Sequence, residues 1–278
     1  MSRPDFEPCR LCETVFDARR ARCPHCQTYR GLADTATVLP NGRELVDETV
    51  LLSEVTDSPI ERIYSGPWDK AFGGGIVRTS VTLLGGAPGA GKSTMSLQIA
   101  NNIADSPIYK GIHDREVLYV GAEEIAHEIK FRAQRLQLPN ISRIRVLPMG
   151  SISSLGDVMM SRKPLAVMLD SLPGFTEDPI EAVKLCKALK PYAGDLLCPI
   201  IVIDHINKDG GFAGFIKLEH GVDTTLLLEV DEGDGIRSLS ARKNRFGPTV
   251  DSEVLLRMTA QGLVLFDEDD AEEYEDES

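Results

Sequence analysis

The 278-residue sequence contains no run of about 18 apolar residues and no apolar segment near its N-terminus. Neither a membrane-spanning helix nor a signal peptide is therefore predicted, and the cytoplasm is the default expectation. The sequence also has no excess of basic residues, because its formal net charge is −13. An acidic balance usually argues against a nucleic-acid partner. Nine of the carboxylates, however, lie in residues 267–278, so the rest of the chain does not exclude such a partner.

Cysteine is scarce after residue 26, because four of the six cysteines lie in residues 1–26. These four form two CxxC pairs that are ten residues apart, which is the spacing of a tetrahedral zinc site: Cys9, Cys12, Cys23 and Cys26. Zinc would supply the folding energy of such a short segment, about 10–16 kcal/mol of apparent binding. Two disulfides are the alternative, but they are rare in the cytosol. We expect residues 1–30 to form a zinc-binding module.

Residues 86–93 read GAPGAGKS and match the phosphate-loop pattern GxxxxGK(S/T). An apolar segment precedes the loop and a helical pattern follows it, as this motif requires. Lys92 would neutralise the β- and γ-phosphates of ATP, and Ser93 would hold Mg²⁺. The sequence therefore predicts a nucleoside triphosphate site. The expected nucleotide contacts are Gly86, Pro88, Gly89, Ala90, Gly91, Lys92, Ser93 and Thr94.

Strand-like and helix-like segments alternate after the phosphate loop, which predicts an α/β fold with a mainly parallel sheet between two helical layers. The expected strands are 81–84, 117–120, 144–147, 165–169 and 200–203, followed by antiparallel or mixed strands at 224–230, 237–242, 250–258 and 263–266. The expected helices are 92–104, 125–136, 154–160 and 180–189. The expected domains are the zinc module, a linker over 31–59, an ATPase core over 60–266 and a disordered acidic tail over 267–278. Within the core, the three glycines at 73–75 are expected to form a flexible joint.

Two segments place acids directly at strand ends. Residues 165–170 form an apolar run that ends in Asp170, as in a Walker B strand, where the carboxylate holds Mg²⁺. Residues 117–124 end in Glu123 and Glu124, and a carboxylate there can polarise the attacking water. Isolated strand-end acids are usually solvated, but next to a phosphate loop they become catalytic candidates.

These motifs, taken in order, resemble the bacterial RadA (Sms) recombination ATPases, which belong to the RecA-like class. The resemblance covers the CxxC pairs, the phosphate loop and four further motifs: YVGAEE at 119–124, DHINKDG at 204–210, LEHGVD at 218–223 and KNRFG at 243–247. The last pentapeptide is the most specific. The resemblance implies a RecA-like P-loop NTPase core that uses ATP and Mg²⁺ and is preceded by a Cys₄ zinc knuckle.

The resemblance also assigns roles to single residues. Glu123 matches the glutamate that activates water, and His205 matches the residue that senses the γ-phosphate. Lys243 and Arg245 match a basic pair that RecA-like rings and filaments insert into the site of the neighbouring subunit. A homo-oligomer is therefore implied, a hexameric ring or a filament. RadA proteins continue into a Lon-protease-like domain, whereas this chain is expected to end in its acidic tail, which leaves the oligomeric state open.

DNA contacts are expected in a glycine-rich segment, 207–215, which has the composition of a mobile loop. Lysines there could contact phosphates and aromatic rings could stack on bases. The candidates are Lys208, Gly210, Phe212, Phe215 and Lys217. In the alternative interpretation, Phe212 and Phe215 pack beneath the loop. The acidic tail is interpreted as solubilising, as a dock for a basic protein partner or as a mimic of nucleic acid.

The sequence thus predicts an ATP-dependent motor that acts on single-stranded DNA in recombination, repair or replication. A phage-type replicative helicase is one alternative, and a KaiC-like regulatory switch that does not use DNA is the other.

Overall fold

The computed structural model describes two parts of the chain, Met1–Ser58 and Pro59–Ser278, which form separate compact units. In the second unit, residues 60–109, 115–148, 152–205 and 211–266 are described, apart from 232 and 234, with backbone only at 152–153 and 211–214. In the first unit, residues 51 and 53 and four short strands are described: β1 (Phe6–Pro8), β2 (Val15–Asp17), β3 (Thr37–Val38) and β4 (Glu44–Leu45). The pairs β1–β2 and β3–β4 are antiparallel. The four predicted zinc ligands, almost all of the predicted linker and the acidic tail lie outside the described residues.

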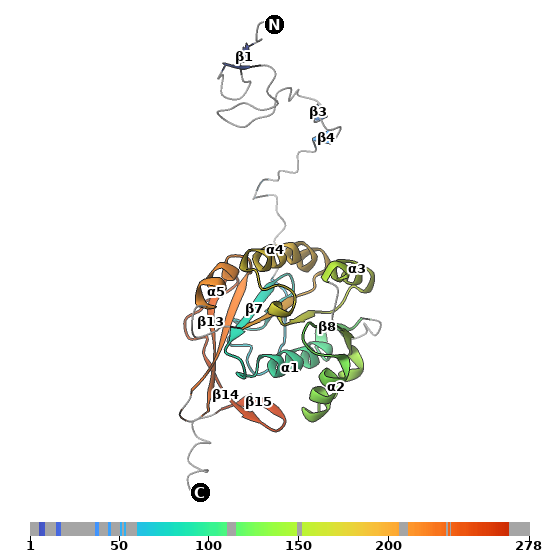
Figure 1. The fold of residues 1–278 in the computed structure, drawn as a ribbon, viewed down its shortest axis with the longest axis vertical. Helices are drawn as coiled ribbons and strands as arrows, with labels where there is room; N and C mark the ends of the chain where they lie inside the picture. The colour runs from blue at the N-terminus through green and yellow to red at the C-terminus, as the bar shows by residue number, and fades with distance from the viewer. Residues whose placement is uncertain are drawn as a thin grey trace, which may run out of the picture. The chain divides into compact units, whose positions relative to one another are not determined.

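The second unit is built on a nine-stranded sheet with the order β15-β14-β13-β12-β7-β11-β10-β8-β9 (Figure 1). Its strands are β7 (Val81–Gly86), β8 (Val117–Gly121), β9 (Ile144–Leu147), β10 (Val167–Asp170), β11 (Ile200–His205), β12 (Thr224–Val230), β13 (Arg237–Asn244), β14 (Val254–Thr259) and β15 (Gly262–Leu265). Strands β12, β7, β11, β10, β8 and β9 pair parallel to one another, whereas β13, β14 and β15 continue the sheet beyond β12 with antiparallel pairing. The predicted parallel sheet with an antiparallel extension at one edge is therefore confirmed.

In the described part of this unit, α-helices cover both faces of the sheet, with α1 and α2 on one face and α3, α4 and α5 on the other (Figure 1). They are α1 (Lys92–Ala104), α2 (Ala126–Arg135), α3 (Ile152–Arg162), α4 (Pro179–Leu196) and α5 (Gly211–Glu219). Successive strand residues face opposite cores, so Tyr119 belongs to the core with α1, whereas Leu118 belongs to the core with α4. Because both faces are covered, the parallel strands are apolar on both sides. No helix in the described part of the chain is long and apolar enough to cross a bilayer.

The parallel register brings distant segments together at the carboxyl edge of the sheet. His205 pairs with Gly86, and Asp170 pairs with Gly121. The phosphate loop, the Asp170 strand end and the Glu123 loop therefore meet at this edge, which is where open α/β sheets bind ligands. The opposite edge holds the start of β7 and the end of β13.

A short hairpin precedes the sheet and differs from its prediction. Strands β5 (Arg62–Ile63) and β6 (Ile76–Val77) pair antiparallel, and the glycines at 73–75 lie in the turn between them. The amides of Gly74 and Gly75 both donate to the carbonyl of Asp69, at 2.9 and 3.3 Å. The prediction of a flexible joint is wrong, because positive φ angles at these glycines allow a closed, hydrogen-bonded turn.

Two helices also differ from their predictions. α4 continues through Pro191 to Leu196, although proline usually ends a helix. Ala193 on the far side of this proline is fully buried in the core with Leu189, so the helix packs against the sheet on both sides of the proline. α5 occupies the second half of the segment that was predicted as a mobile loop. Phe215 and Leu218, three residues apart, pack into the core and stabilise a helix that the glycine content disfavours.

Candidate active site

The phosphate loop connects β7 to α1 at the carboxyl edge of the sheet. Gly89 and Gly91 have φ angles of 82° and 109°, which only glycine adopts readily. Gly91 is the N-cap of α1, so the first free amides of the helix face the concave side of the loop. This combination of backbone amides and a helix N-terminus is an anion-binding arrangement.

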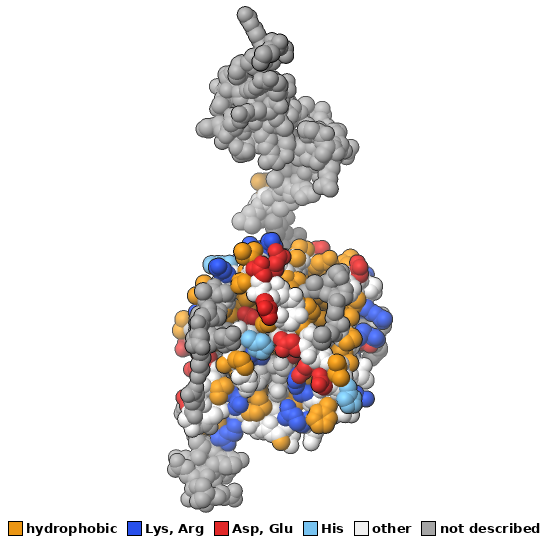
Figure 2. All heavy atoms as spheres, viewed as in Figure 1, with side chains coloured by type: hydrophobic (Ala, Val, Ile, Leu, Met, Phe, Trp, Pro, Cys, Tyr) orange, Lys and Arg blue, Asp and Glu red, His pale blue; other side chains and the backbone are white. Residues whose placement is uncertain are grey.

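Lys92 is the charged centre of the loop. Its Nζ donates to the carbonyls of Gly86 at 2.7 Å and of Ala87 at 2.8 Å, and the residue is 3% exposed. Burial lowers the pKa of Lys92 to about 8, although the nearby carboxylates of Asp170, Asp204 and Glu123 oppose the shift. Figure 2 shows acidic side chains and a histidine close together on one face of the core. The carboxylates of Asp170, Asp204 and Glu123 thus place negative charge near the lysine that is predicted to bind phosphate.

Asp170 and Ser93 form the candidate magnesium site. The hydroxyl of Ser93 donates to Oδ1 of Asp170 at 3.1 Å, and the hydroxyl of Tyr119 donates to Oδ2. The Ser93 hydroxyl and the Asp170 carboxylate are hard oxygen ligands of the kind that Mg²⁺ takes, so these two residues fit the ion. Tyr119 was not predicted as a site residue. The available signal was a tyrosine in a fully buried strand, whose hydroxyl requires a partner.

The two strand-end glutamates differ in their surroundings. Glu124 forms an ion pair with Arg132 of α2, which occupies its carboxylate. Glu123 has a half-exposed side chain and accepts a hydrogen bond from the hydroxyl of Ser171. Its Oε1 lies 3.9 Å from Nε2 of His205. Glu123 thus points toward the nucleotide loop and keeps access to solvent. The geometry favours Glu123 over Glu124 as the residue that would orient water, a role that stays a prediction, and adds Ser171 as its partner.

His205 ends β11 beside the phosphate loop. Burial and the positive charge of Lys92 lower its pKa, so the imidazole is neutral near pH 7. Its Nδ1 is buried and has no hydrogen-bond partner among the described residues. A buried nitrogen without a partner is costly, and it is available to a ligand that enters the site.

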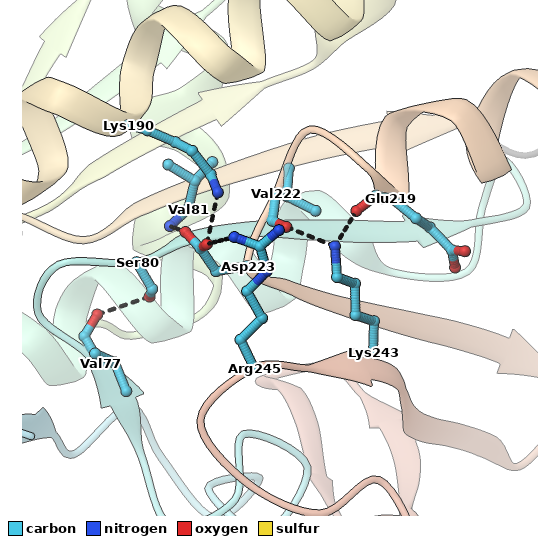
Figure 3. Close-up of polar contacts among 9 residues, drawn as sticks. All are labelled: Val77, Ser80, Val81, Lys190, Glu219, Val222, Asp223, Lys243 and Arg245. Atoms are coloured by element: carbon cyan, nitrogen blue, oxygen red, sulfur yellow. Dashed lines mark hydrogen bonds and ion pairs between the residues drawn. The ribbon is translucent and has the colours of Figure 1, made fainter. Parts of the chain in front are cut away.

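The basic pair lies at the opposite end of the parallel strands, because the end of β13 pairs with the start of β12, which in turn pairs with the start of β7. Figure 3 shows the contacts of the two side chains. Nζ of Lys243 donates to the carbonyls of Glu219 and Val222, and Nη1 of Arg245 donates to Asp223 at 3.1 Å. The structure therefore brings Lys92, Ser93, Glu123, Asp170 and His205 together but does not bring Lys243 and Arg245 to them.

The predicted DNA-contacting residues divide into three groups. Phe215 is 1% exposed and packs in the core with α4, so the prediction that it stacks on bases is wrong. Lys217 is exposed on α5 and stays a candidate. Lys208, Gly210 and the side chain of Phe212 lie outside the described residues.

Known proteins resemble this chain in both sequence and fold. DNA repair protein RadA of Haemophilus influenzae is 32% identical over an alignment of 275 residues that covers 92% of this chain and 58% of that protein. RadA of Bacillus subtilis is 33% identical over an alignment of 218 residues that covers 76% of this chain and 46% of that protein. The chain thus spans about half the length of these relatives. The predicted RadA resemblance is confirmed.

Among solved structures, a KaiC-like protein from Pyrococcus horikoshii superposes with a TM-score of 0.61 at 17% identity, over 75% of this chain and 100% of that one. This likeness concerns the fold alone, and it confirms the predicted RecA-like α/β core. The model of the AAA domain family matches residues 65–211, which include the phosphate loop and the strand that ends in Asp170. That match extends over more than half of the sequence, and by it this chain belongs to the AAA domain family.

Proposed function

We propose that this chain is an ATP-driven motor that acts on single-stranded DNA in recombination, repair or replication. It would work as a homo-oligomer, a hexameric ring or a filament, in which neighbouring subunits share each ATP site. The relatives named DNA repair protein RadA support the process, and the phosphate loop with its strand-end acids supports the ATPase chemistry.

The position of Arg245 is the main support for an ATP site that is shared between subunits. Its amide donates to the carbonyl of Asp223, and the amide of Asp223 donates to the carbonyl of Val81, the first residue of β7. Lys92 binds the carbonyl of Gly86, the last residue of β7. The six residues of β7 separate these points by about 16 Å at a strand rise of 3.3 Å per residue. Arg245 therefore cannot reach a phosphate in its own loop, and it is available to a neighbour.

Within one subunit, the remaining groups divide the work on ATP. Lys92 and the loop amides would bind the phosphates, Ser93 and Asp170 would hold Mg²⁺, and Glu123 would orient the attacking water. Bound Mg²⁺ would neutralise charge on the β- and γ-phosphates. An arginine that enters from a neighbour stabilises charge on the transferred group and is worth about 10³–10⁵ in rate in well-studied NTPases. A separated monomer would accordingly hydrolyse ATP slowly.

His205 would couple the nucleotide to DNA. It lies beside Gly86 and Glu123, and α5 begins six residues later. A γ-phosphate that engages the unpaired Nδ1 would shift the segment between β11 and α5, where Lys208, Gly210 and Phe212 are the proposed DNA contacts, with Lys217 on α5 itself. The Cys₄ zinc module and an acidic tail that docks a basic partner are further proposals from the sequence.

The experiment that tests the proposal is steady-state ATPase activity with and without single-stranded DNA, for the wild type and for Arg245→Ala. We expect strong stimulation by DNA and its loss in the variant. Arg242→Ala is the matched control, because Arg242 lies three residues before Arg245, near the end of β13, but pairs with Glu219. Activity that is indifferent to DNA would refute the motor and favour a nucleotide-controlled protein switch.

A further inference from the structure

A buried carboxylate, that of Asp223, connects the segments around Arg245 at the amino ends of the parallel strands. Asp223 lies between α5 and β12, is 7% exposed and makes hydrogen bonds with both carboxylate oxygens (Figure 3). Oδ1 accepts from Nζ of Lys190 at 2.7 Å and from Nη1 of Arg245 at 3.1 Å, and Oδ2 accepts from the amide of Val81 at 3.1 Å. The carboxylate is thus held from α4, from β7 and from the turn directly after β13, and its orientation is fixed.

This arrangement leaves about half of the Arg245 side chain exposed to solvent. The Arg245 side chain is 52% exposed although its Nη1 is tied to Asp223. The backbone amide of Arg245 also donates to Asp223, at 3.1 Å, so main chain and side chain are anchored to one residue. A guanidinium has five N–H donors in a rigid plane. One of these donors is bound to Asp223, and about half of the side chain remains exposed to solvent.

Lys243 is held differently. Its Nζ donates to two carbonyls, those of Glu219 at the end of α5 and of Val222. Burial, Arg245 and Lys190 lower the pKa of Lys243. Its ammonium is therefore engaged by the turn after α5, and Arg245 is the member of the pair that is presented to solvent.

The local charge remains favourable for a phosphate. Lys190, Lys243 and Arg245 lie around the single carboxylate of Asp223, and the other acid nearby, Glu219, pairs with Arg242. The cluster keeps a net positive charge while one of its members fixes the geometry. Positive potential at a surface attracts anionic groups.

We propose that Asp223 is a positioning residue for Arg245 and holds its guanidinium ready for the nucleotide phosphates of a neighbouring subunit. This inference rests on the proposed function, specifically on ATP sites shared between subunits. It assigns to Asp223 a role in the site of the neighbour rather than in its own.

The test mixes subunits that are each inactive alone. Subunits with Arg245→Ala keep a working phosphate loop but supply no arginine, and subunits with Lys92→Ala supply the arginine but bind no phosphate. Their mixture should restore ATPase activity if sites are shared. The donor subunit is then changed to Lys92→Ala with Asp223→Asn, which keeps the shape of the side chain and removes its charge. A displacement of about 1 Å can cost on the order of 100-fold in rate, so we expect the restored activity to fall about 10- to 100-fold.

Lys190→Met in the donor is the matched control, because it removes an ion pair from the same carboxylate oxygen but leaves Arg245 anchored. We expect this donor to restore activity fully. Asp223→Asn with an intact phosphate loop should also accept an arginine from Lys92→Ala subunits, which reports that it folds and assembles.

Each result has a distinct meaning. If the first mixture restores no activity, the shared site itself is refuted. If it does and the Asp223→Asn donor works equally well, only the positioning role is overturned. Equal losses for the Asp223 and Lys190 donors, or failure of Asp223→Asn as an acceptor, would assign Asp223 to the fold and also overturn the proposal.

Discussion

Tyr119→Phe removes a hydroxyl from beneath the candidate magnesium site without changing the shape of the core. Tyr119 is fully buried in β8, and its hydroxyl donates to Oδ2 of Asp170, while Ser93 donates to Oδ1. Burial is also the main reason why the pKa of Tyr119 lies well above its usual value, so the hydroxyl keeps its proton and stays a donor. The variant leaves a partly buried carboxylate oxygen without this donor.

The size of the effect follows from the charge of the acceptor. A hydrogen bond to a charged group contributes about 1.5–3 kcal/mol, so the free energy of unfolding should fall by that amount. For a domain of this size, each kcal/mol shifts the melting temperature by about 2–4 °C. Loss of an outer partner of a metal ligand typically costs about 10- to 100-fold in affinity or activity. The Mg²⁺ concentration for half-maximal ATPase activity should rise accordingly.

Chemical denaturation and Mg²⁺ titrations of ATPase activity measure the two effects. Tyr109→Phe is the matched control, because Tyr109 is equally buried but its hydroxyl donates to the neutral carbonyl of Leu165 at 3.1 Å. It should lose about 0.5–1.5 kcal/mol of stability and leave the Mg²⁺ requirement unchanged. The reasoning is refuted if Tyr119→Phe keeps the wild-type Mg²⁺ requirement, or if both variants shift it equally.

The other predictions concern charge and space around the same site. Because the pKa of Lys92 is about 8 and the ammonium is the form that binds phosphate, ATP affinity should be nearly constant below pH 8. Above it, the affinity should fall by up to about tenfold per pH unit, as binding isotherms between pH 7 and 9.5 would show. Glu123→Gln should lower the ATPase turnover number by at least about 100-fold, whereas Glu124→Gln, which only weakens an ion pair, should retain most of it. Gly174→Ala should lower both stability and turnover, because its new Cβ would lie 2.5 Å from the methyl group of the alanine before Glu123 and 3.1 Å from Cγ of Glu123. The expected cost of this overpacking is about 1–3 kcal/mol in thermal or denaturant unfolding, and Gly194→Ala, whose Cβ would meet nothing within 4 Å, is its control.

Contrary results would be informative for each of these variants. ATP affinity that stays constant to pH 9.5 would mean that Lys92 keeps its charge throughout. Equal losses for the two glutamate variants would remove the distinction between them. A fully active and stable Gly174→Ala would show that the loop after β10 can move away from Glu123.

The sequence was sufficient to locate the phosphate loop, because the residues that form it are close together in the chain. Gly89, Gly91 and Lys92 lie within four residues, and the backbone angles that glycine permits determine where the amides and the ammonium point. The alternation of apolar strands and helices likewise predicted the sheet, since periodicity depends only on neighbours in sequence. Asp170 was predictable for the same reason, because it ends an apolar strand in a chain that already carries a phosphate loop.

Long-range pairings were not predictable in this way. Ser171 and Glu123 are 48 residues apart, and Tyr119 and Asp170 are 51 residues apart, so their contacts depend on β8 and β10 being adjacent in the sheet. Phe215 could not be assigned from its glycine-rich surroundings, because only its packing against the core with α4 decides whether the ring is buried or faces a ligand.

The sequence by itself therefore determined that this chain is a RecA-like P-loop protein and where its phosphate loop lies, because those properties follow from residue type and local spacing. The tertiary structure alone decided that Glu124 pairs with Arg132 while Glu123 contacts Ser171, and that Arg245 lies at the far end of the parallel strands, anchored by Asp223. The order and register of the strands set those distances, and no short segment of sequence contains them.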